Sequence, residues 1–191
     1  MLMPSSLSRQ ELAGLAESQT VEFKKSLSLT EEGLVALNAM LNADTAKGLV
    51  LFGVGPDGAT SGIEPGNHDT AQRSMAQRIR AKFDPPLSVN IELVECDGRI
   101  LLAVRAERSP GVPYHEFDGR AYIREGSSNR LLSIADKQQL ARRRRRDLHN
   151  GPWRCNCCGS WVGQLVSYEI TDTGVRKSFS CECGGEYWPA T

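Results

Sequence analysis

The pattern of apolar and polar positions predicts an α+β domain over the first three quarters of the chain. Apolar residues three or four apart, as at Leu34, Leu37 and Leu41, are typical of a helix, whereas alternation or a short apolar run is typical of a strand. The expected helices begin at a capping box over 8–11, at Thr30, at Asp69 and after Ser133. The expected strands are 20–24, 49–54, 88–95, 100–106 and 121–124, with an Asp97-Gly98 hairpin turn between the third and the fourth.

The last 40 residues have a different character, because they hold five of the six cysteines. Two strands are expected there, 161–170 and 175–179, joined by a turn over 171–174. A boundary over 147–152 would divide the chain into a domain of residues 1–147 and a small domain of residues 152–191. A segment this short needs a metal or another cross-link to fold.

The spacing of these cysteines favours a structural zinc ribbon, in which two short thiolate turns complete a tetrahedral site. The four expected ligands are Cys155, Cys158, Cys181 and Cys183. Cys157 could compete with a neighbouring ligand, and disulfides are the alternative, although they fit poorly with a chain that has no evident secretion signal. Cys96 lies in a predicted strand far upstream and is expected to be a core thiol.

Composition sets wider limits. The chain has 191 residues and no net charge, and it has neither a signal-like apolar run at its start nor a membrane span, so a cytoplasmic protein is expected. Residues 1–147 contain 20 Lys and Arg against 19 Asp and Glu, and five of the 20 form one unbroken arginine run. Without that run the region is acidic, so attraction to nucleic acid must be local.

Two carboxylates stand five positions apart at Glu17 and Glu22, and Lys24 follows two residues later. This spacing places side chains about 140° apart on a helix and on opposite faces of a strand, so the acids converge only if the backbone changes between them. A helix that ends near Glu17 before the strand that carries Glu22 would provide that change. The pair could bind a divalent cation. The alternative is a solvated helix end followed by an edge strand.

Four elements, in order, resemble the Schlafen-type AlbA-like domain. They are E-S-x-x-x-E-F-K at 17–24, a segment similar to A-N-T-x-G-G-x-x-x-I-G-V at 43–54, the turn Asp57-Gly58 with Gly62-Ile63, and Y-x-R-x-G-S-S at 122–128. The resemblance covers roughly residues 11–140. It implies a mixed sheet with flanking helices, here followed by the small β-rich zinc ribbon. The chain departs from the family pattern at Asp44, where asparagine is usual, and at Lys47, where glycine is usual.

The resemblance implies an activity, because the animal Schlafens include metal-dependent ribonucleases that cut transfer and ribosomal RNA with three carboxylates. Glu17 and Glu22 match two of these acids directly, and Asp57 matches the third with an offset of about one position. Asp44 is the alternative source of a carboxylate. Three such acids would hold Mg²⁺ or Mn²⁺, which lowers the pKa of bound water and neutralises charge at the phosphorus.

Basic residues near these elements are candidates for phosphate contact. They are Lys24, Lys47, Arg124, Arg130, Arg142, Arg143, Arg144, Arg145 and Arg146. Lys24 could also form a salt bridge with Glu22, and the arginine run could be a solvated tail.

The expected function is therefore that of a metal-dependent endoribonuclease acting on structured RNA such as tRNA, with RNA favoured over DNA. One alternative is a non-catalytic nucleic-acid-binding or DNA-binding regulator with a structural zinc ribbon. Another is a protein whose ribbon docks a second polypeptide. Because the animal enzymes use two lobes to form a groove and this chain has one, a homodimer is a further hypothesis. The chain has no Walker phosphate loop, so ATP hydrolysis has no support.

Overall fold

The computed structural model describes residues 5–6, 14–64, 66, 68–109 and 111–150, and then the strand segments 153–154, 161–162, 164–171, 174–180 and 186–187. Side chains are described between residues 14 and 144. The chain divides into two compact units, Met1–Ala141 and Arg142–Thr191.

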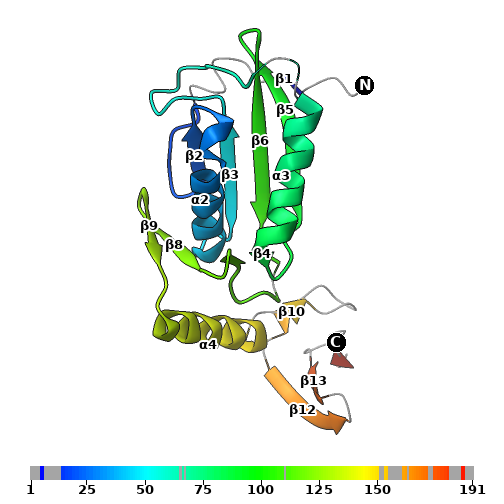
Figure 1. Ribbon diagram of the computed structural model, residues 1–191. Helices are drawn as coiled ribbons and strands as arrows, with labels where there is room; N and C mark the ends of the chain where they lie inside the picture. The colour runs from blue at the N-terminus through cyan, green and yellow to red at the C-terminus, as the bar shows by residue number, and fades with distance from the viewer. Residues whose placement is uncertain are drawn as a thin grey trace. The chain divides into compact units, whose positions relative to one another are not determined.

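A five-stranded mixed sheet forms the centre of the first unit (Figure 1). Its strands are β1 (Ser5–Ser6), β2 (Val21–Lys24), β3 (Lys47–Phe52), β5 (Val89–Cys96) and β6 (Arg99–Glu107), in the order β1-β5-β6-β3-β2. Strands β5, β6 and β3 are antiparallel neighbours, while β2 runs parallel to β3 and β1 runs parallel to β5. The predicted α+β class and mixed sheet are confirmed.

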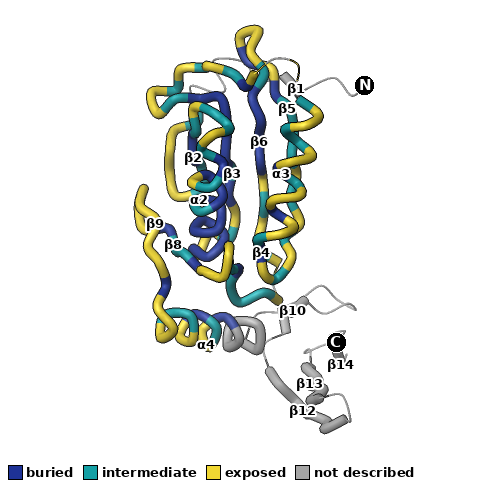
Figure 2. The backbone as a smooth tube through the Cα atoms, in the orientation of Figure 1, coloured by how far each residue is buried: buried dark blue, intermediate teal, exposed yellow. Residues whose placement is uncertain are grey.

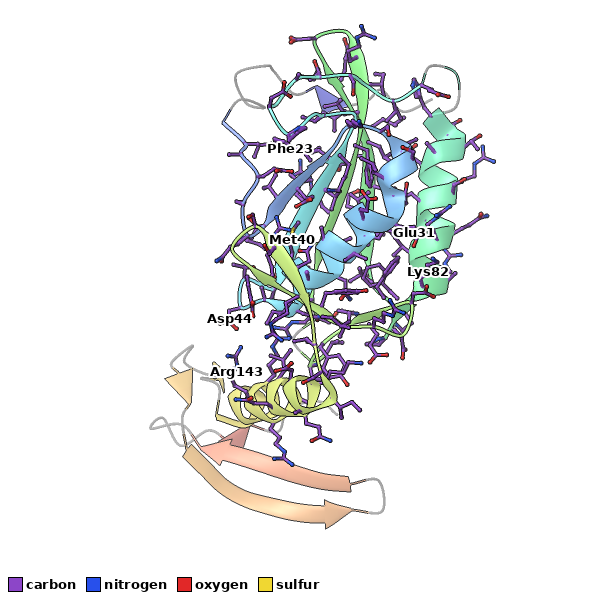
Figure 3. All side chains as sticks on the ribbon, turned by 60° about the vertical axis from the view of Figure 1, so that its left-hand side comes forward. Phe23, Glu31, Met40, Asp44, Lys82 and Arg143 are labelled. Carbon is purple, nitrogen blue, oxygen red and sulfur yellow. The ribbon has the colours of Figure 1, made fainter. Side chains whose placement is uncertain are left out.

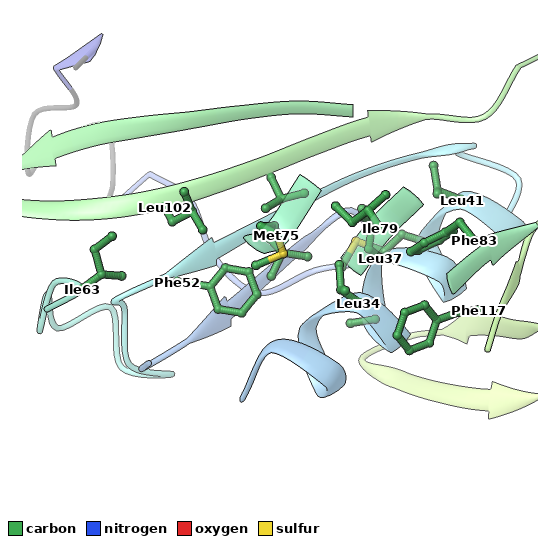
Figure 4. Packing of buried hydrophobic residues seen from close by; sticks show 14 residues of the cluster. Leu34, Leu37, Leu41, Phe52, Ile63, Met75, Ile79, Phe83, Leu102 and Phe117 are labelled. Atoms are coloured by element: carbon green, nitrogen blue, oxygen red, sulfur yellow. The ribbon is translucent and has the colours of Figure 1, made fainter. Parts of the chain in front are cut away.

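Two helices, α2 (Thr30–Asn42) and α3 (His68–Lys82), cover one face of this sheet (Figure 1). The main core lies between the helices and the sheet, where apolar side chains of α2 and α3 meet those of β3 and β6 (Figure 4). Burial is concentrated in α2, β3 and the centre of β6 (Figure 2). Glu31 of α2 also accepts hydrogen bonds from Lys82 and Arg78 of α3, and this ion pairing joins the two helices (Figure 3).

The start of α2 differs in one respect from the prediction. Thr30 does not cap α2, because the short 3-10 helix η1 (Leu27–Leu29) precedes it and the Thr30 hydroxyl donates to the Leu27 carbonyl oxygen at 2.6 Å. The start of the helix expected from the capping box over 8–11 falls on residues that lie outside the described ones.

Shorter elements complete the first unit. Strand β4 (Phe83–Asp84) pairs with β7 (Glu116–Phe117), and β8 (Tyr122–Glu125) pairs with β9 (Ser128–Leu131). Helix α4 (Ile134–Asn150) begins after Ser133, as predicted, and continues past the boundary between the units. Ser133 and Asp136 cap it reciprocally, since the Asp136 amide donates to Ser133 Oγ and the Ser133 amide donates to Asp136 Oδ2.

A buried asparagine pair ties α2 to the loop before β7 and to β8. Asn42 Nδ2 donates to the carbonyl oxygens of His115 and Tyr122 at 2.8 and 2.9 Å, and its Oδ1 accepts from the His115 amide at 2.9 Å. Asn38 binds the same two residues, at the His115 carbonyl and the Tyr122 amide. These amides supply backbone hydrogen bonds that no sheet provides there.

His115 is buried, and its Nδ1 donates to the Pro85 carbonyl oxygen at 2.9 Å. Burial lowers the pKa of this imidazole below its usual value, because desolvation disfavours the charged ring. In the unfolded chain the ring takes up a proton below about pH 6.5, while in the folded chain it stays neutral to lower pH. The free energy of unfolding should therefore decrease as the pH is lowered below about 6.5, by up to roughly 1.4 kcal/mol per pH unit from this group.

Urea unfolding of the wild type and of His115→Gln between pH 5.5 and 7.5 measures the effect. The variant should lose less stability over that range, and identical pH slopes would show that His115 is not the group responsible.

The second unit contains antiparallel strands. β10 (Trp153–Arg154) pairs with β11 (Trp161–Val162), while β12 (Gln164–Thr171), β13 (Gly174–Ser180) and β14 (Glu186–Tyr187) form a three-stranded sheet. The two predicted strands are thereby confirmed, with the first divided into β11 and β12. Residues 172 and 173 of the expected turn lie outside the described residues. The cysteines that we expected to bind zinc, Cys155, Cys158, Cys181 and Cys183, lie outside the described residues, as does Cys157. Among the helices that the structure describes, none is both long enough and apolar enough to cross a membrane.

Candidate functional site

Strand β2 places the two acids of the 17–24 element in different surroundings. In the parallel pairing with β3, Glu22 lies beside Val50 and Phe23 lies beside Leu51. Val50 belongs to the core under the helices, whereas Phe23 and Leu51 belong to a second cluster, on the face of the sheet away from the helices. Because side chains alternate along a strand, Glu22 and Lys24 point toward the helical side and Phe23 points away.

Glu22 is buried in an ion-pair network. Its Oε1 accepts from Lys24 Nζ at 2.6 Å, and its Oε2 accepts from Arg124 Nη2 at 2.7 Å. The salt bridge predicted between Lys24 and Glu22 is therefore present. The guanidinium of Arg124 is only 1% exposed and also donates to the Ser18 carbonyl and to Asn129 Oδ1. It thus joins the 17–24 and 122–128 elements, although they are 102 residues apart at this contact.

Glu17 is exposed and lies at the open edge of the sheet. Its Oε1 accepts from the Phe23 amide at 3.1 Å, and the Ser18 amide donates to the Val21 carbonyl at 2.9 Å. Both partners belong to the edge of β2 that has no neighbour among the described strands. In this arrangement the carboxylate of Glu17 covers an otherwise open strand edge.

Glu17 and Asp57 line one hollow of about 500 Å³ on the side of the sheet away from the helices, together with Asp97 and Phe23. Asp57 Oδ1 accepts from the Ala59 amide at 3.1 Å in a tight turn. Glu22 does not line this hollow. Of the three expected catalytic acids, the structure therefore brings Glu17 and Asp57 to one hollow and holds Glu22 elsewhere.

This arrangement does not fit a Mg²⁺ or Mn²⁺ ion held by Glu17, Glu22 and Asp57 together, because Lys24 and Arg124 take up both oxygens of Glu22. Within the described part of the chain, no group of three or more Asp, Glu, His or Cys side chains is placed to hold a metal. The other candidate, Asp44, is exposed and precedes β3, near the end of α2 (Figure 3). Asp57 follows β3, so a strand of roughly 20 Å separates these two acids.

Gly53 and Gly62, from the second and third family elements, lie against each other next to the end of β2. Gly53 has φ +95°, and a Cβ there would lie 2.8 Å from the Gly62 carbonyl carbon. The Gly53 amide donates to the Lys24 carbonyl at 2.7 Å. Only glycine combines this backbone conformation with such a close approach, so the second and third elements help to fix the end of β2.

The expected phosphate contacts also separate into two groups. Lys24 and Arg124 are committed to Glu22, and Arg130 is bound to Glu125 at 2.7 Å and Asp136 at 3.0 Å. Lys47, in contrast, is exposed at the start of β3. In the second unit, Arg142 and Arg143 are exposed on α4 and Arg144 is buried, while the side chains of Arg145 and Arg146 lie outside the described set.

A groove of about 600 Å³ lies at the β2–β3–β6–β5 part of the sheet and includes Lys47. Arg105, Val21, Leu49 and Asn90 also line it. Sequence reasoning did not identify Arg105. The available signal was the alternation within β6, where Arg105 follows Leu101 and Ala103 at every second position and so shares their face.

Comparisons with solved structures found 13 similar chains, among them the following two. The N-terminal domain of a RecG-related protein from Nitrosomonas europaea is 24% identical, with a TM-score of 0.44, covering 66% of this chain and 91% of that one. The DIP2311 protein from Corynebacterium diphtheriae is 18% identical, with a TM-score of 0.47, covering 69% of this chain but only 26% of that one. A search of curated proteins found no match. A protein-family model matches residues 17–133, which contain the four elements from the E-S-x-x-x-E-F-K segment to the Y-x-R-x-G-S-S segment, and the chain belongs to that family, Schlafen, AlbA_2.

Proposed function

We propose that this chain is a nucleic-acid-binding protein and that the 17–24 element, as the structure holds it, supports the fold of the binding domain. The observation that carries the proposal is the distribution of paired and unpaired cations. Lys24, Arg124 and Arg130 are bound to carboxylates, whereas Lys47 and Arg105 line one groove. Neither of these two side chains has an ion pair or hydrogen bond with the residues that the structure describes.

Two unpaired cations in one groove suit a polyanion, because releasing condensed counterions from phosphates supplies most of the affinity of nonspecific binding. The exposed arginines of the run on α4 would add to this attraction. RNA is the favoured target, since the resemblance to the animal Schlafens implies RNA, and binding should need no divalent cation.

Metal-dependent endoribonuclease activity on structured RNA such as tRNA is the second candidate. Glu17 and Asp57 support it because they line one hollow with Asp97. Against it stands the buried position of Glu22, which would have to exchange Lys24 and Arg124 for a metal.

One experiment tests both candidates. Fluorescently labelled tRNA, single-stranded RNA and single-stranded DNA are titrated with the full chain in EDTA, and the same mixtures are then incubated with Mg²⁺ or Mn²⁺ and run on a denaturing gel. We expect salt-sensitive binding in EDTA and intact RNA after incubation with metal. Absence of binding at low salt would contradict the nucleic-acid proposal. Metal-dependent cleavage that is lost in both Asp57→Asn and Glu22→Gln would establish the second candidate instead.

We also propose one structural zinc, held by Cys155, Cys158, Cys181 and Cys183. Elemental analysis would then report one zinc per chain. Two copies are proposed to bind one RNA, as a single lobe leaves a groove half complete, and a monomer throughout the micromolar range by light scattering would exclude a free dimer.

A further inference from the structure

We propose that the groove around Lys47 and Arg105 holds a single strand of nucleic acid, with its phosphates at the two cations and a base or sugar against Val21 and Leu49. This inference rests on the proposed nucleic-acid function and gives it a surface, a strand type and a contact residue, Arg105, that lies outside the family elements.

The register of the sheet sets the groove's geometry. Val21 pairs with Leu49, Leu49 with Arg105, and Arg105 with Asn90, so these side chains form a row across four strands on the face away from the helices. In the adjoining row Lys47 pairs with Glu107. The two cations therefore stand on neighbouring strands, in successive rows of one face.

This face changes character along the strands. Toward the Phe23 end it is closed, because Phe23, Leu51 and Leu101 are buried with Leu15 packed against them. Toward the Lys47 end it is open. There, Val21 and Leu49 are half-buried, and Lys47 and Arg105 are exposed at the groove of about 600 Å³. A space of this size with an apolar floor and a few polar groups is typical of a small-molecule or nucleotide site.

The charge of the groove differs from that of the domain around it. Without its arginine run the region 1–147 is acidic, with 15 Lys and Arg against 19 Asp and Glu. Among the described residues that line the groove there are two cations and one carboxylate, Glu107. A local excess of positive charge within an acidic domain favours a compact anion such as a phosphodiester and gives the strand a preferred position.

The lining also indicates the strand type. A duplex hides the faces of its bases, whereas a single strand can lay them on an apolar surface. Val21 and Leu49 provide such a surface, and none of the described residues that line the groove is aromatic. Stacking should therefore be weak, and binding should depend more on the backbone than on the base sequence.

The test compares two double variants of the full chain that change the charge equally. The first, Lys47→Glu with Arg105→Glu, reverses the charge of the two cations in the groove. The second, Arg73→Glu with Arg80→Glu, reverses the charge of two exposed residues of α3 on the other side of the sheet. Affinity for a labelled single-stranded RNA is measured by anisotropy at several salt concentrations. We expect the groove variant to bind at least tenfold more weakly than the wild type and the α3 variant to stay within about threefold of the wild-type affinity.

The neutral variant, Lys47→Gln with Arg105→Gln, should reduce the slope of log K against log salt by about 1.4, because each lost contact to a single strand removes about 0.7.

The outcomes separate the inference from the proposed function. Failure of the wild type to bind any nucleic acid would overturn both. Equal losses in the groove and α3 variants would overturn the groove while leaving the function intact. Thermal unfolding of each variant shows whether it folds. Should the charge reversal unfold the chain, the neutral variant decides, and an unchanged salt slope in it would overturn the inference. A duplex of the same sequence bound as tightly as the single strand would overturn the assignment of strand type.

Discussion

Replacing Arg124 with alanine is expected to lower the free energy of unfolding by about 3–5 kcal/mol. The substitution leaves the buried carboxylate of Glu22 with Lys24 alone, which is the more solvent-exposed of its two cationic partners. The same change removes the hydrogen bonds from Arg124 to the Ser18 carbonyl and to Asn129. Urea unfolding at pH 7 measures the loss.

Arg130→Ala is the matched control. Like Arg124, Arg130 lies in the β8–β9 hairpin and forms ion pairs, in its case with Glu125 and Asp136. The side chain of Arg130 is 45% exposed. Exposed ion pairs contribute up to about 1 kcal/mol, so this control should cost far less than Arg124→Ala. A paired variant, Glu22→Gln with Arg124→Met, should recover part of the loss because it removes both charges. Equal losses for Arg124→Ala and Arg130→Ala would contradict a stabilising role for the buried ion pair between Arg124 and Glu22.

Asn42→Ala is the second large effect, with an expected loss of roughly 3 kcal/mol or more. The substitution removes hydrogen bonds to the His115 amide, the His115 carbonyl and the Tyr122 carbonyl. The His115 carbonyl keeps its hydrogen bond from Asn38, so the loss falls mainly on the His115 amide and the Tyr122 carbonyl. Each buried backbone group left without a partner costs about 1–3 kcal/mol.

Asn90→Ala serves as the comparison for Asn42, since Asn90 is exposed and, among the described residues, its side-chain amide binds only Glu92. A change within about 0.5 kcal/mol is expected there. Thermal and urea unfolding of both variants test the difference. If Asn42→Ala unfolds with the stability of Asn90→Ala, the asparagine pair does not hold the hairpin to α2.

Much of the fold was predictable because its signals are local. The apolar runs of β3 and β6, the Asp97-Gly98 turn and the spacing of Met75 and Ile79 all depend on residues close together in sequence. The Asp97-Gly98 turn has positive φ at both positions, as the tight hairpin requires. Local patterns gave no sign of Asn38 and Asn42, because their partners are more than 70 residues away.

The site was predictable only in part, for the same reason. Sequence spacing identified Glu22 and Lys24 as neighbours, and their salt bridge is present. It could not show that Arg124 is buried on Glu22, since that contact depends on how the β8–β9 hairpin packs beside α2. Nor could it reveal Arg105, whose place beside Leu49 depends on the pairing of β3 with β6.

The most direct test of the account is to map where nucleic acid contacts the domain. Backbone amide resonances of the isotopically labelled full chain are followed by NMR during titration with a short single-stranded RNA in EDTA. The account predicts salt-sensitive shifts at Val21, at 47–49 and at 105–107, with little change at Glu17 and Asp57. Shifts centred on Glu17, Asp57 and Asp97, with the 47–49 and 105–107 amides unmoved, would contradict it.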